Sequence, residues 1–298
     1  MTVGLIRTNI LFASLLGIVF FAPKSTSVQS PAAFAAVIAV IEALYLIQHF
    51  RTGKKSVSDI VTVIFSFFII WELAVVAGIA HPVLVPPPEN VFCIFYLNRG
   101  DMLEGLLSSM SILLQGIGTA MLLGVFGGLF VGYVERLRET MLPITKVISS
   151  IPPLVYTPYV VAAMPSFRAA SVFVIFSAVF WPAFMSMISR VGSIDKKIID
   201  SARVMNVSAP VMLFKVILPY SLPDVIGRLS ASLTSAMLCL TGAEMLGASA
   251  GLGYFVKKYS DYADYTRVIA GIIYIAVVIT VLNILVAKLQ KRVIKWKY

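Results

Sequence analysis

The sequence predicts an all-α, polytopic membrane protein, and its composition and long apolar runs carry that prediction. Hydrophobic residues make up 59% of the 298 residues, against roughly 45–50% in soluble proteins. Charged residues make up 13%, against about 25% in soluble proteins. The mean hydropathy is +0.93. The length alone would allow one or two soluble domains, but so few charges would leave a soluble surface apolar and prone to association.

Eight runs are apolar enough to cross a bilayer, for which a helix needs about 20 residues. The first has Arg7 ahead of an apolar core, as a signal peptide does, but no small-x-small cleavage site directly follows Phe21. We therefore expect an uncleaved first span. The eight predicted spans are Leu5–Ala22, Ala32–Gln48, Ile60–Ala80, Leu106–Val134, Val147–Met164, Ser171–Ile188, Asp224–Leu246 and Val268–Ala287.

Basic residues between these spans predict their direction. Segments 1–9, 49–59, 134–146, 189–220 and 288–298 together hold 17 lysines and arginines, whereas the segments on the opposite side hold six. Cytoplasmic loops carry the excess of positive charge, so both termini are predicted to be cytoplasmic. The net charge of +10 therefore indicates topology and does not indicate a nucleic-acid partner.

The largest predicted cytoplasmic loop, 189–220, has the pattern of two short helices. Apolar residues recur at helical spacing and oppose a charged face, and they are Ile194, Ile198, Ile199, Ala202 and Met205. Asn206 then breaks the pattern and tolerates the left-handed conformation of a helix exit. Ser208 is placed to cap a second helix, with Pro210 in its first turn.

The second helix is predicted to present an apolar surface made by Val211, Met212 and Phe214, and Pro219 and Pro223 bracket the return to the membrane. Such a surface suits docking on a partner protein, and it also suits a helix that lies flat on lipid headgroups. Physical chemistry alone leaves these two alternatives equally open.

The same loop resembles the cytoplasmic motif of permeases from binding-protein-dependent ABC importers, which reads E-A-A, three residues, G, nine residues, I-x-L-P. Here the positions are Asp200-Ser201-Ala202, then Asn206, then Val216-Ile217-Leu218-Pro219, with the same spacing throughout. Asp for Glu and Val for Ile are mild changes. Ser for Ala and Asn for Gly are larger ones, although Asn is the next most permissive residue after Gly at a turn.

Three further segments resemble the nitrate/sulfonate/taurine branch of these permeases. Leu84–Val91 is similar to an outer F-L-P-S-P-x-x-V segment, and Ile151–Pro158 is similar to P-P-L-A-x-x-P-L. Gly242–Tyr254 is similar to A-E-M-L-G-A-x-x-G-L-G-Y. The resemblance covers about residues 60–298 and is weak at Pro165–Ala170.

The resemblance implies a six-helix ABC importer permease core at 59–298 with a coupling loop at 194–219, preceded by an extra pair of spans at 1–58. It implies a bacterial cytoplasmic (inner) membrane location and the import of a small solute such as nitrate, a sulfonate or taurine. The implied partners are a cytosolic ATPase dimer, a second permease subunit, an extracytoplasmic solute-binding protein and membrane lipid. The implied ATPase-coupling residues are Asp200, Ser201, Ala202, Asn206, Val211, Met212, Phe214, Leu218 and Pro219.

Three residues are expected to serve the pathway or its gating: Glu244, Pro153 and Pro158. Glu42 and Glu72 lie inside apolar runs, where a charge is costly and often functional. We expect them to have structural partners or to be protonated. A second hypothesis, an ion-coupled secondary transporter or channel, would use both glutamates.

The sequence predicts neither an enzyme nor a cofactor or metal site. Gly53-Lys54-Lys55-Ser56 resembles the end of a P-loop, but Gln48 stands where the first glycine is needed. ATP hydrolysis is therefore expected in a separate subunit. Small residues at every fourth position from Gly116 to Gly132 predict a face where another helix approaches closely.

Overall fold

The computed structural model describes residues 2–24, 27–79, 81 and 83–293, and the described residues are almost all helical. They divide into two compact units. The first comprises residues 1–103 and 255–273, and the second comprises residues 104–254 and 274–298. The predicted end of the third span at Ala80 and the last residues of the cytoplasmic tail, 294–298, lie outside the described residues.

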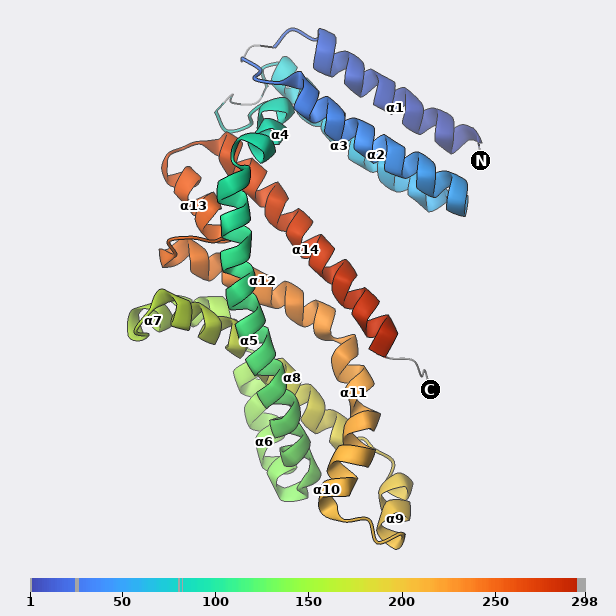
Figure 1. Ribbon diagram of the computed structural model, residues 1–298, viewed down its shortest axis with the longest axis vertical. Coiled ribbons are helices and arrows are strands. Elements are labelled where there is room, and N and C mark those ends of the chain that lie inside the picture. Colours follow the sequence, from blue (N-terminus) through green and yellow to red (C-terminus); the bar gives the residue numbers. More distant parts are fainter. Residues whose placement is uncertain (1, 25–26, 80, 82, 294–298) are drawn as a thin grey trace. The chain divides into compact units, whose positions relative to one another are not determined.

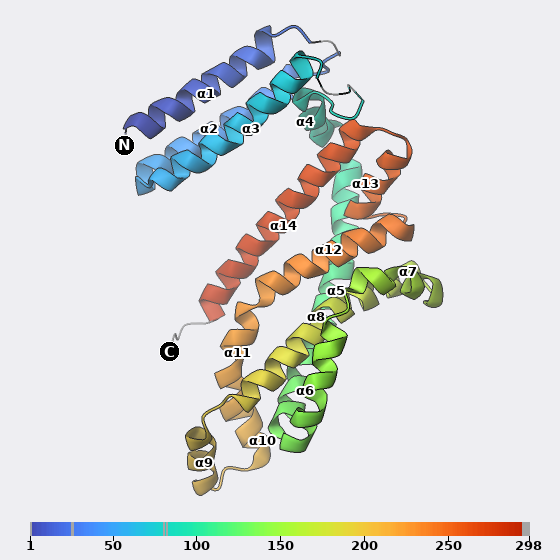
Figure 2. The same cartoon turned by 180° about the vertical axis from the view of Figure 1, so that it is seen from behind.

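The first unit is built on three helices, α1 (Thr2–Phe21), α2 (Pro31–Thr52) and α3 (Lys55–Val76). These helices lie side by side in Figures 1 and 2 and share one apolar core with Leu15, Phe34 and Phe65 at its centre. Pro31 stands in the first turn of α2, where its missing N–H costs nothing. The short helix α4 (Pro88–Leu97) follows and stacks Phe92 against Phe34.

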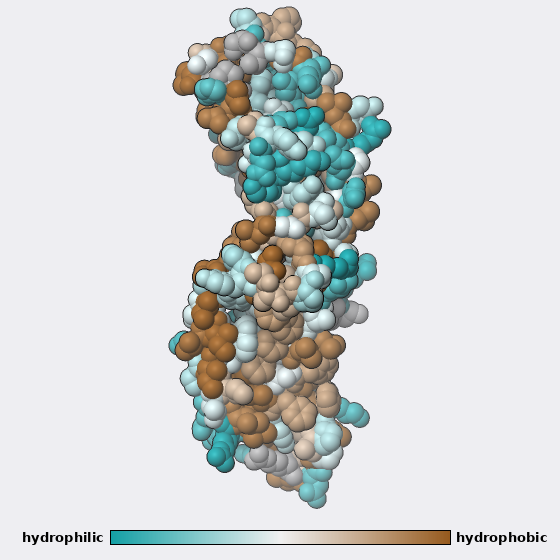
Figure 3. All heavy atoms as spheres, turned by 90° about the vertical axis from the view of Figure 1, so that its left-hand side faces the viewer, coloured by the Kyte–Doolittle hydropathy of each residue, from teal (hydrophilic) through white to brown (hydrophobic). Residues whose placement is uncertain are grey.

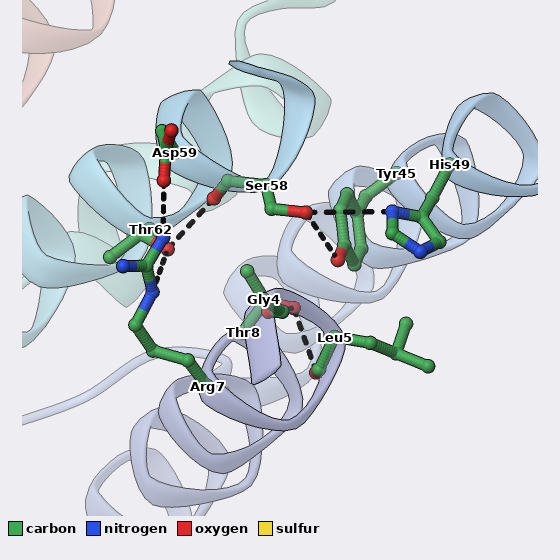
Figure 4. Close-up of polar contacts among 9 residues, drawn as sticks. All are labelled: Gly4, Leu5, Arg7, Thr8, Tyr45, His49, Ser58, Asp59 and Thr62. Carbon is green, nitrogen blue, oxygen red and sulfur yellow. Dashed lines mark hydrogen bonds and ion pairs between the residues drawn. The ribbon is translucent and has the colours of Figure 1, made fainter. Parts of the chain in front are cut away.

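Polar side chains join the three helices at the end where α1 begins (Figure 4). Arg7 of α1 forms an ion pair with Asp59 of α3 at 2.5 Å and donates a hydrogen bond to Thr62 Oγ1 at 3.1 Å. Ser58 Oγ lies 3.0 Å from the Tyr45 hydroxyl and 3.4 Å from His49 Nδ1, so it connects α3 to α2.

Buried charges join the same unit at its other end. The ammonium group of Lys24, in the connection between α1 and α2, lies 3.1 Å from Glu72 Oε2 and also forms an ion pair with Glu89 of α4. All three side chains are buried. Glu72 therefore has a structural ion-pair partner, and the segment before α2 is tied to both α3 and α4.

The second unit contains most of α5 (Arg99–Tyr133), followed by α6 (Glu135–Ser149), α7 (Pro153–Ala163), α8 (Phe167–Gly192) and α9 (Lys196–Val204). After α9 come α10 (Ala209–Val211), a π-helical segment (Met212–Ile217), α11 (Leu218–Gly227) and α12 (Leu229–Gly247). The helices α13 (Leu252–Asp261) and α14 (Tyr265–Val293) each have residues in both units.

The small residues of α5 are the place where α8 crosses it. A Cβ atom added at Gly128 would lie 2.7 Å from Met187 Cβ and 2.8 Å from the backbone oxygen of Phe184. Gly116, Gly124 and Gly132 also approach α8 at distances that leave little or no room for a methyl group. The predicted close-approach face is therefore used within this chain.

Eight of the described helices are long and apolar enough to cross a membrane by length and composition, and seven of them correspond to predicted spans. The predicted span Val147–Met164 is wrong as a single helix, because the chain breaks at residues 150–152 between α6 and α7. The helical stretch Ala209–Gly227 is a candidate span that the sequence analysis assigned largely to a loop. Figure 3 shows apolar side chains over much of one face, as expected of a lipid-facing surface.

Candidate functional site

In the second unit, α9 and the turn after it, residues 196–207, form a bend that we call the elbow. Its inner face is fixed by Ala202, which is buried, and by Ile199, which packs beside it. The preceding Ile194 is buried in the same core. This core also contains Leu129 of α5 and Met187 of α8, so the elbow is packed onto the spans and not attached loosely to them.

The turn at the end of the elbow is made by Asn206, whose φ of 55° is left-handed. The N–H of Val207 donates to the carbonyl oxygen of Ala202, which closes the helix end. This confirms the predicted helix exit at Asn206. The next helix begins directly after Ser208 with Pro210 in its first turn, as predicted, although the Ser208 side chain makes no capping hydrogen bond.

The turn exposes two apolar side chains that the sequence analysis did not assign to the site as a pair. Val204 is 86% exposed and Met205 is 78% exposed. Met205 was expected on the packed face of the helix, but the end of α9 at Val204 releases it from the helical period. In the sequence, this exposed pair could have been recognised from two consecutive apolar residues directly before an asparagine that ends the helix.

The predicted coupling residues divide into an exposed set and a packed set. Asp200, Ser201, Asn206 and Pro219 are exposed, and Val211 and Phe214 are exposed in part. Leu218 packs against the core without being fully buried. Ala202 and Met212 are buried at 9% and 2% exposure, so the expectation that Met212 presents an apolar surface is wrong. Both residues hold the elbow in place from inside.

The helix after the turn runs on without a break, so Pro219 and Pro223 do not bracket the return to the membrane. Both lie within the helical stretch 209–227. Proline has no N–H and its ring crowds the carbonyl group four residues earlier. The turn before Pro219 is π-helical, and the N–H of Leu218 bonds to the carbonyl of Leu213, five residues back. The wider π turn accommodates the proline within a continuous helix.

An arginine at the end of α8 connects the elbow region to α11. Arg190 Nε lies 2.6 Å from Asp224 Oδ2, and its guanidinium stands 4.8 Å from the centre of the Tyr220 ring. An ion pair combined with a cation–π contact fixes the angle between two helices better than either alone. The end of α8 is thus tied to α11, which leads into α12.

Glu244, near the end of α12, is buried and accepts hydrogen bonds from α5 and α13. Ser109 Oγ of α5 donates to Glu244 Oε1 at 2.6 Å, and the N–H of Gly253 donates to Oε2 at 2.7 Å. Ser109 in turn accepts the N–H of Leu252 at 2.9 Å. Gly251, at φ 144°, is required because a Cβ there would overlap the Glu244 carboxyl group. The geometry places Glu244 in helix-to-helix attachment.

The other two predicted pathway residues shape α7. Pro153 is in the first turn of this helix, directly after the break, and Pro158 lies inside it. Thr157 is buried, and its hydroxyl group donates to the Pro153 carbonyl oxygen at 2.8 Å. Pro153 therefore stands where α7 starts, and Pro158 removes one backbone donor inside the helix.

A cavity of about 250 Å³ lies where α8 approaches the α11–α12 bend. Arg228, at the bend, and Ser186, Ser232 and Ser235 contribute the polar part of its wall. A neighbouring cavity of about 340 Å³ shares Arg228 and Ser186 and extends to Ser189 and Ser193.

Comparisons with known proteins show which family this chain is similar to. Residues 120–295 match the family model described as "binding-protein-dependent transport system inner membrane component". The chain is 26% identical over 234 residues to the taurine transport system permease protein TauC of Escherichia coli (strain K12), covering 76% of this chain and 85% of that protein.

Two further relatives carry other solutes in their names. The bicarbonate transport system permease protein CmpB of Synechococcus elongatus (strain ATCC 33912 / PCC 7942 / FACHB-805) is 27% identical over 246 residues, covering 78% of this chain and 87% of that protein. The nitrate import permease protein NrtB of Leptolyngbya laminosa is 29% identical over 204 residues, with coverages of 67% and 73%.

Proposed function

We propose a transport cycle for this chain from one premise: the chain belongs to the binding-protein-dependent transport system inner membrane component family and is the permease subunit of an ABC importer. Two such subunits, identical or related, form a pathway for a small solute. An extracytoplasmic binding protein delivers the solute to the outer face. A separate cytosolic ATPase dimer supplies the energy, and this chain carries out translocation only.

The elbow is the site at which the ATPase binds this subunit. The observation that carries this assignment is the pair of exposed apolar side chains, Val204 and Met205, on a rigidly packed turn. An apolar knob held by a buried helix face can enter a groove and transmit force. The coupling set is Asp200, Ser201, Asn206, Val211, Phe214 and Pro219 around this knob, with Ala202, Met212 and Leu218 supporting it from inside.

The motion starts when ATP draws the two ATPase subunits together. Each ATPase subunit carries its elbow with it, and the pair of Arg190 and Asp224 passes the movement from α8 to α11. The spans then change from inward-open to outward-open, a bistable rearrangement of packed helices. Glu244, Pro153 and Pro158 act in this change as fixed joints, since Glu244 is fully occupied by hydrogen bonds to Ser109 and Gly253.

In the proposed membrane topology, α6 and α7 together cross the membrane once, and α10, α11 and α12 together cross it once. With α1, α2, α3, α5, α8 and α14 this gives eight crossings and places both termini in the cytoplasm. The elbow then lies on the cytoplasmic side. Residues 1–58 are an additional pair of spans, and residues 59–298 are the permease core.

Reconstitution tests the proposal. The full chain, its ATPase and its binding protein are placed in liposomes, and uptake of radiolabelled taurine, nitrate and bicarbonate is measured. We expect uptake of one of these solutes that requires both ATP and the binding protein. Uptake that persists without the ATPase and collapses with the proton gradient would instead support the ion-coupled transporter.

Cysteine crosslinking tests the elbow by itself. Met205→Cys should crosslink to the ATPase, whereas Val63→Cys, an equally exposed site on α3, should not. Crosslinks from Met205→Cys to lipid alone would refute the elbow as the docking site.

A further inference from the structure

The cavity at the α11–α12 bend carries a positive charge that nothing in the described part of the chain neutralises. Arg228 lies between Gly227, the last residue of α11, and Leu229, the first of α12. The nearest carboxylate along the helix, Asp224, is bound to Arg190 instead. Among the described residues, no ion pair or hydrogen bond occupies the Arg228 guanidinium. Arg228 is exposed in this chain, so its guanidinium is open to a ligand that enters the cavity.

Free hydroxyl groups surround this charge. Ser232 and Ser235 are three residues apart and therefore share a face of α12, and Ser186 faces them from α8. A serine inside a helix commonly bonds back to a carbonyl one turn earlier. Within the described residues these three hydroxyl groups make no such bond, so all three can donate to a ligand.

The chemistry of this wall selects an anion. A guanidinium presents a planar fork of N–H donors that matches the oxygen atoms of planar or tetrahedral oxyanions. Hydroxyl donors supply the remaining hydrogen bonds. The rest of the wall is apolar, with Met121, Pro182 and Val225. Low-dielectric walls strengthen the field of Arg228 in the cavity. The volume of about 250 Å³ admits a small solute.

The route continues from this cavity toward the elbow. Ser186 and Ser189 lie three residues apart on one face of α8, and Ser193, whose hydroxyl group donates to the Arg190 carbonyl oxygen, directly follows the helix; together they form a line of hydroxyl groups. The neighbouring cavity of about 340 Å³ contains this line and shares Arg228 with the first. In this second cavity Arg190 is neutralised by Asp224, which leaves Arg228 as the charge that an anion would meet.

We propose that this cavity is the anion site of the translocation pathway, with Arg228 as the charge that holds the solute and Ser186, Ser232 and Ser235 as its hydroxyl donors. The Ser189–Ser193 line is the exit toward the cytosol. The proposal rests on the permease function and adds to it the place in this chain where a small anionic solute is held.

Charged thiol reagents test the site without any transport measurement. A Ser232→Cys chain in membrane vesicles is labelled with 2-sulfonatoethyl methanethiosulfonate, an anion, and with 2-(trimethylammonium)ethyl methanethiosulfonate, a cation. Each rate is divided by its rate with a free thiol in solution. The two native cysteines, Cys93 and Cys239, are buried, and the unsubstituted chain gives their background.

We expect the anionic reagent to be favoured about tenfold or more, the scale on which a charged cleft concentrates an opposite charge. Arg228→Gln in the same background should abolish this preference, and Ser235→Asp should reverse it. Arg136→Gln is the matched control, because it removes one exposed positive charge from α6 and should leave the ratio unchanged. Methanesulfonate should slow the labelling, and neutral acetamide should not.

Lipid headgroups are the competing source of an anion, so the labelling is repeated in vesicles of phosphatidylcholine alone and of phosphatidylcholine with phosphatidylglycerol. Protection by methanesulfonate that is the same in both supports a solute site. Protection that appears only with phosphatidylglycerol identifies a lipid site and overturns the proposal. A charge preference that survives both Arg228→Gln and Ser235→Asp overturns it as well. None of these outcomes depends on the ATPase, so a failed uptake assay and a failed anion site are distinguished.

Discussion

Replacing Val204 and Met205 together by alanine should weaken the ATPase–permease complex while leaving the permease itself folded. The two side chains are 86% and 78% exposed in this chain, so their truncation removes almost no internal packing. Surface substitutions of this kind usually change stability by less than about 0.5 kcal/mol. Any larger effect on the transporter must then come from the surface that covers them.

The size of the effect follows from the atoms removed. The valine truncation deletes two methyl groups and the methionine truncation deletes three heavy atoms, each worth about 0.8 kcal/mol when buried. Full burial in a groove gives a loss of about 4 kcal/mol and half burial gives about 2 kcal/mol. Because about 1.4 kcal/mol is a tenfold change in affinity, the complex should weaken by about 30- to 1,000-fold.

The assay is the affinity of the purified ATPase for the permease in detergent, measured by titration of a labelled ATPase, with uptake measured in parallel. Val63→Ala, an exposed apolar truncation on α3, is the matched control and should change neither quantity. An affinity that stays within about threefold for the double variant, under 0.7 kcal/mol, would refute the elbow as the gripped surface.

Three further substitutions have defined outcomes. Gly128→Ala should lower stability by about 1–3 kcal/mol, because its new methyl group meets Met187 and a backbone oxygen of α8, whereas Gly118→Ala, with open space around it, should not; thermal unfolding in detergent measures both. Glu244→Gln should cost about 1.5–3 kcal/mol, since one of its two carboxylate acceptors becomes a donor facing an N–H or hydroxyl donor, and thermal unfolding should register that loss. Lys24→Met should lower the stability of the first unit by about 3–5 kcal/mol, because it leaves the buried carboxylates of Glu72 and Glu89 without their cation, and adding Glu72→Gln should recover part of this loss. Limited proteolysis of the first unit measures both effects. Equal cleavage rates for the unsubstituted protein, Lys24→Met and the double variant would contradict the ion-pair account.

The spans could be predicted because each depends on about 20 consecutive residues of one character. The turn at Asn206 could be predicted too, because few residues tolerate a φ of 55°. The prediction failed where three-dimensional packing decided the outcome. Met212 looks as exposed as Phe214 in the sequence, but the π turn directs Met212 into the core.

The break in Val147–Met164 and the partners of Glu72 show the same limit. Hydropathy alone gives no boundary at Ser150, whereas two consecutive prolines, 152 and 153, start a new helix there. The pairing of Glu72 with Lys24 joins positions 48 residues apart in the chain. Arg228 was visible as a charge, but its role depends on the hydroxyl groups that α8 and α12 bring to it.

The π-helical segment Met212–Ile217 lies between the elbow and α11 and affects how the elbow is oriented around the helix axis. A π turn holds one residue more than an α turn, so everything before Met212 is rotated by about 100° around the helix axis relative to an uninterrupted α-helix. Deleting one residue there would restore an ordinary α turn and leave the helices on both sides in nearly the same orientation. The one extra residue next to Pro219 is thus absorbed within a single wide turn, and the helix stays continuous on both sides of the proline.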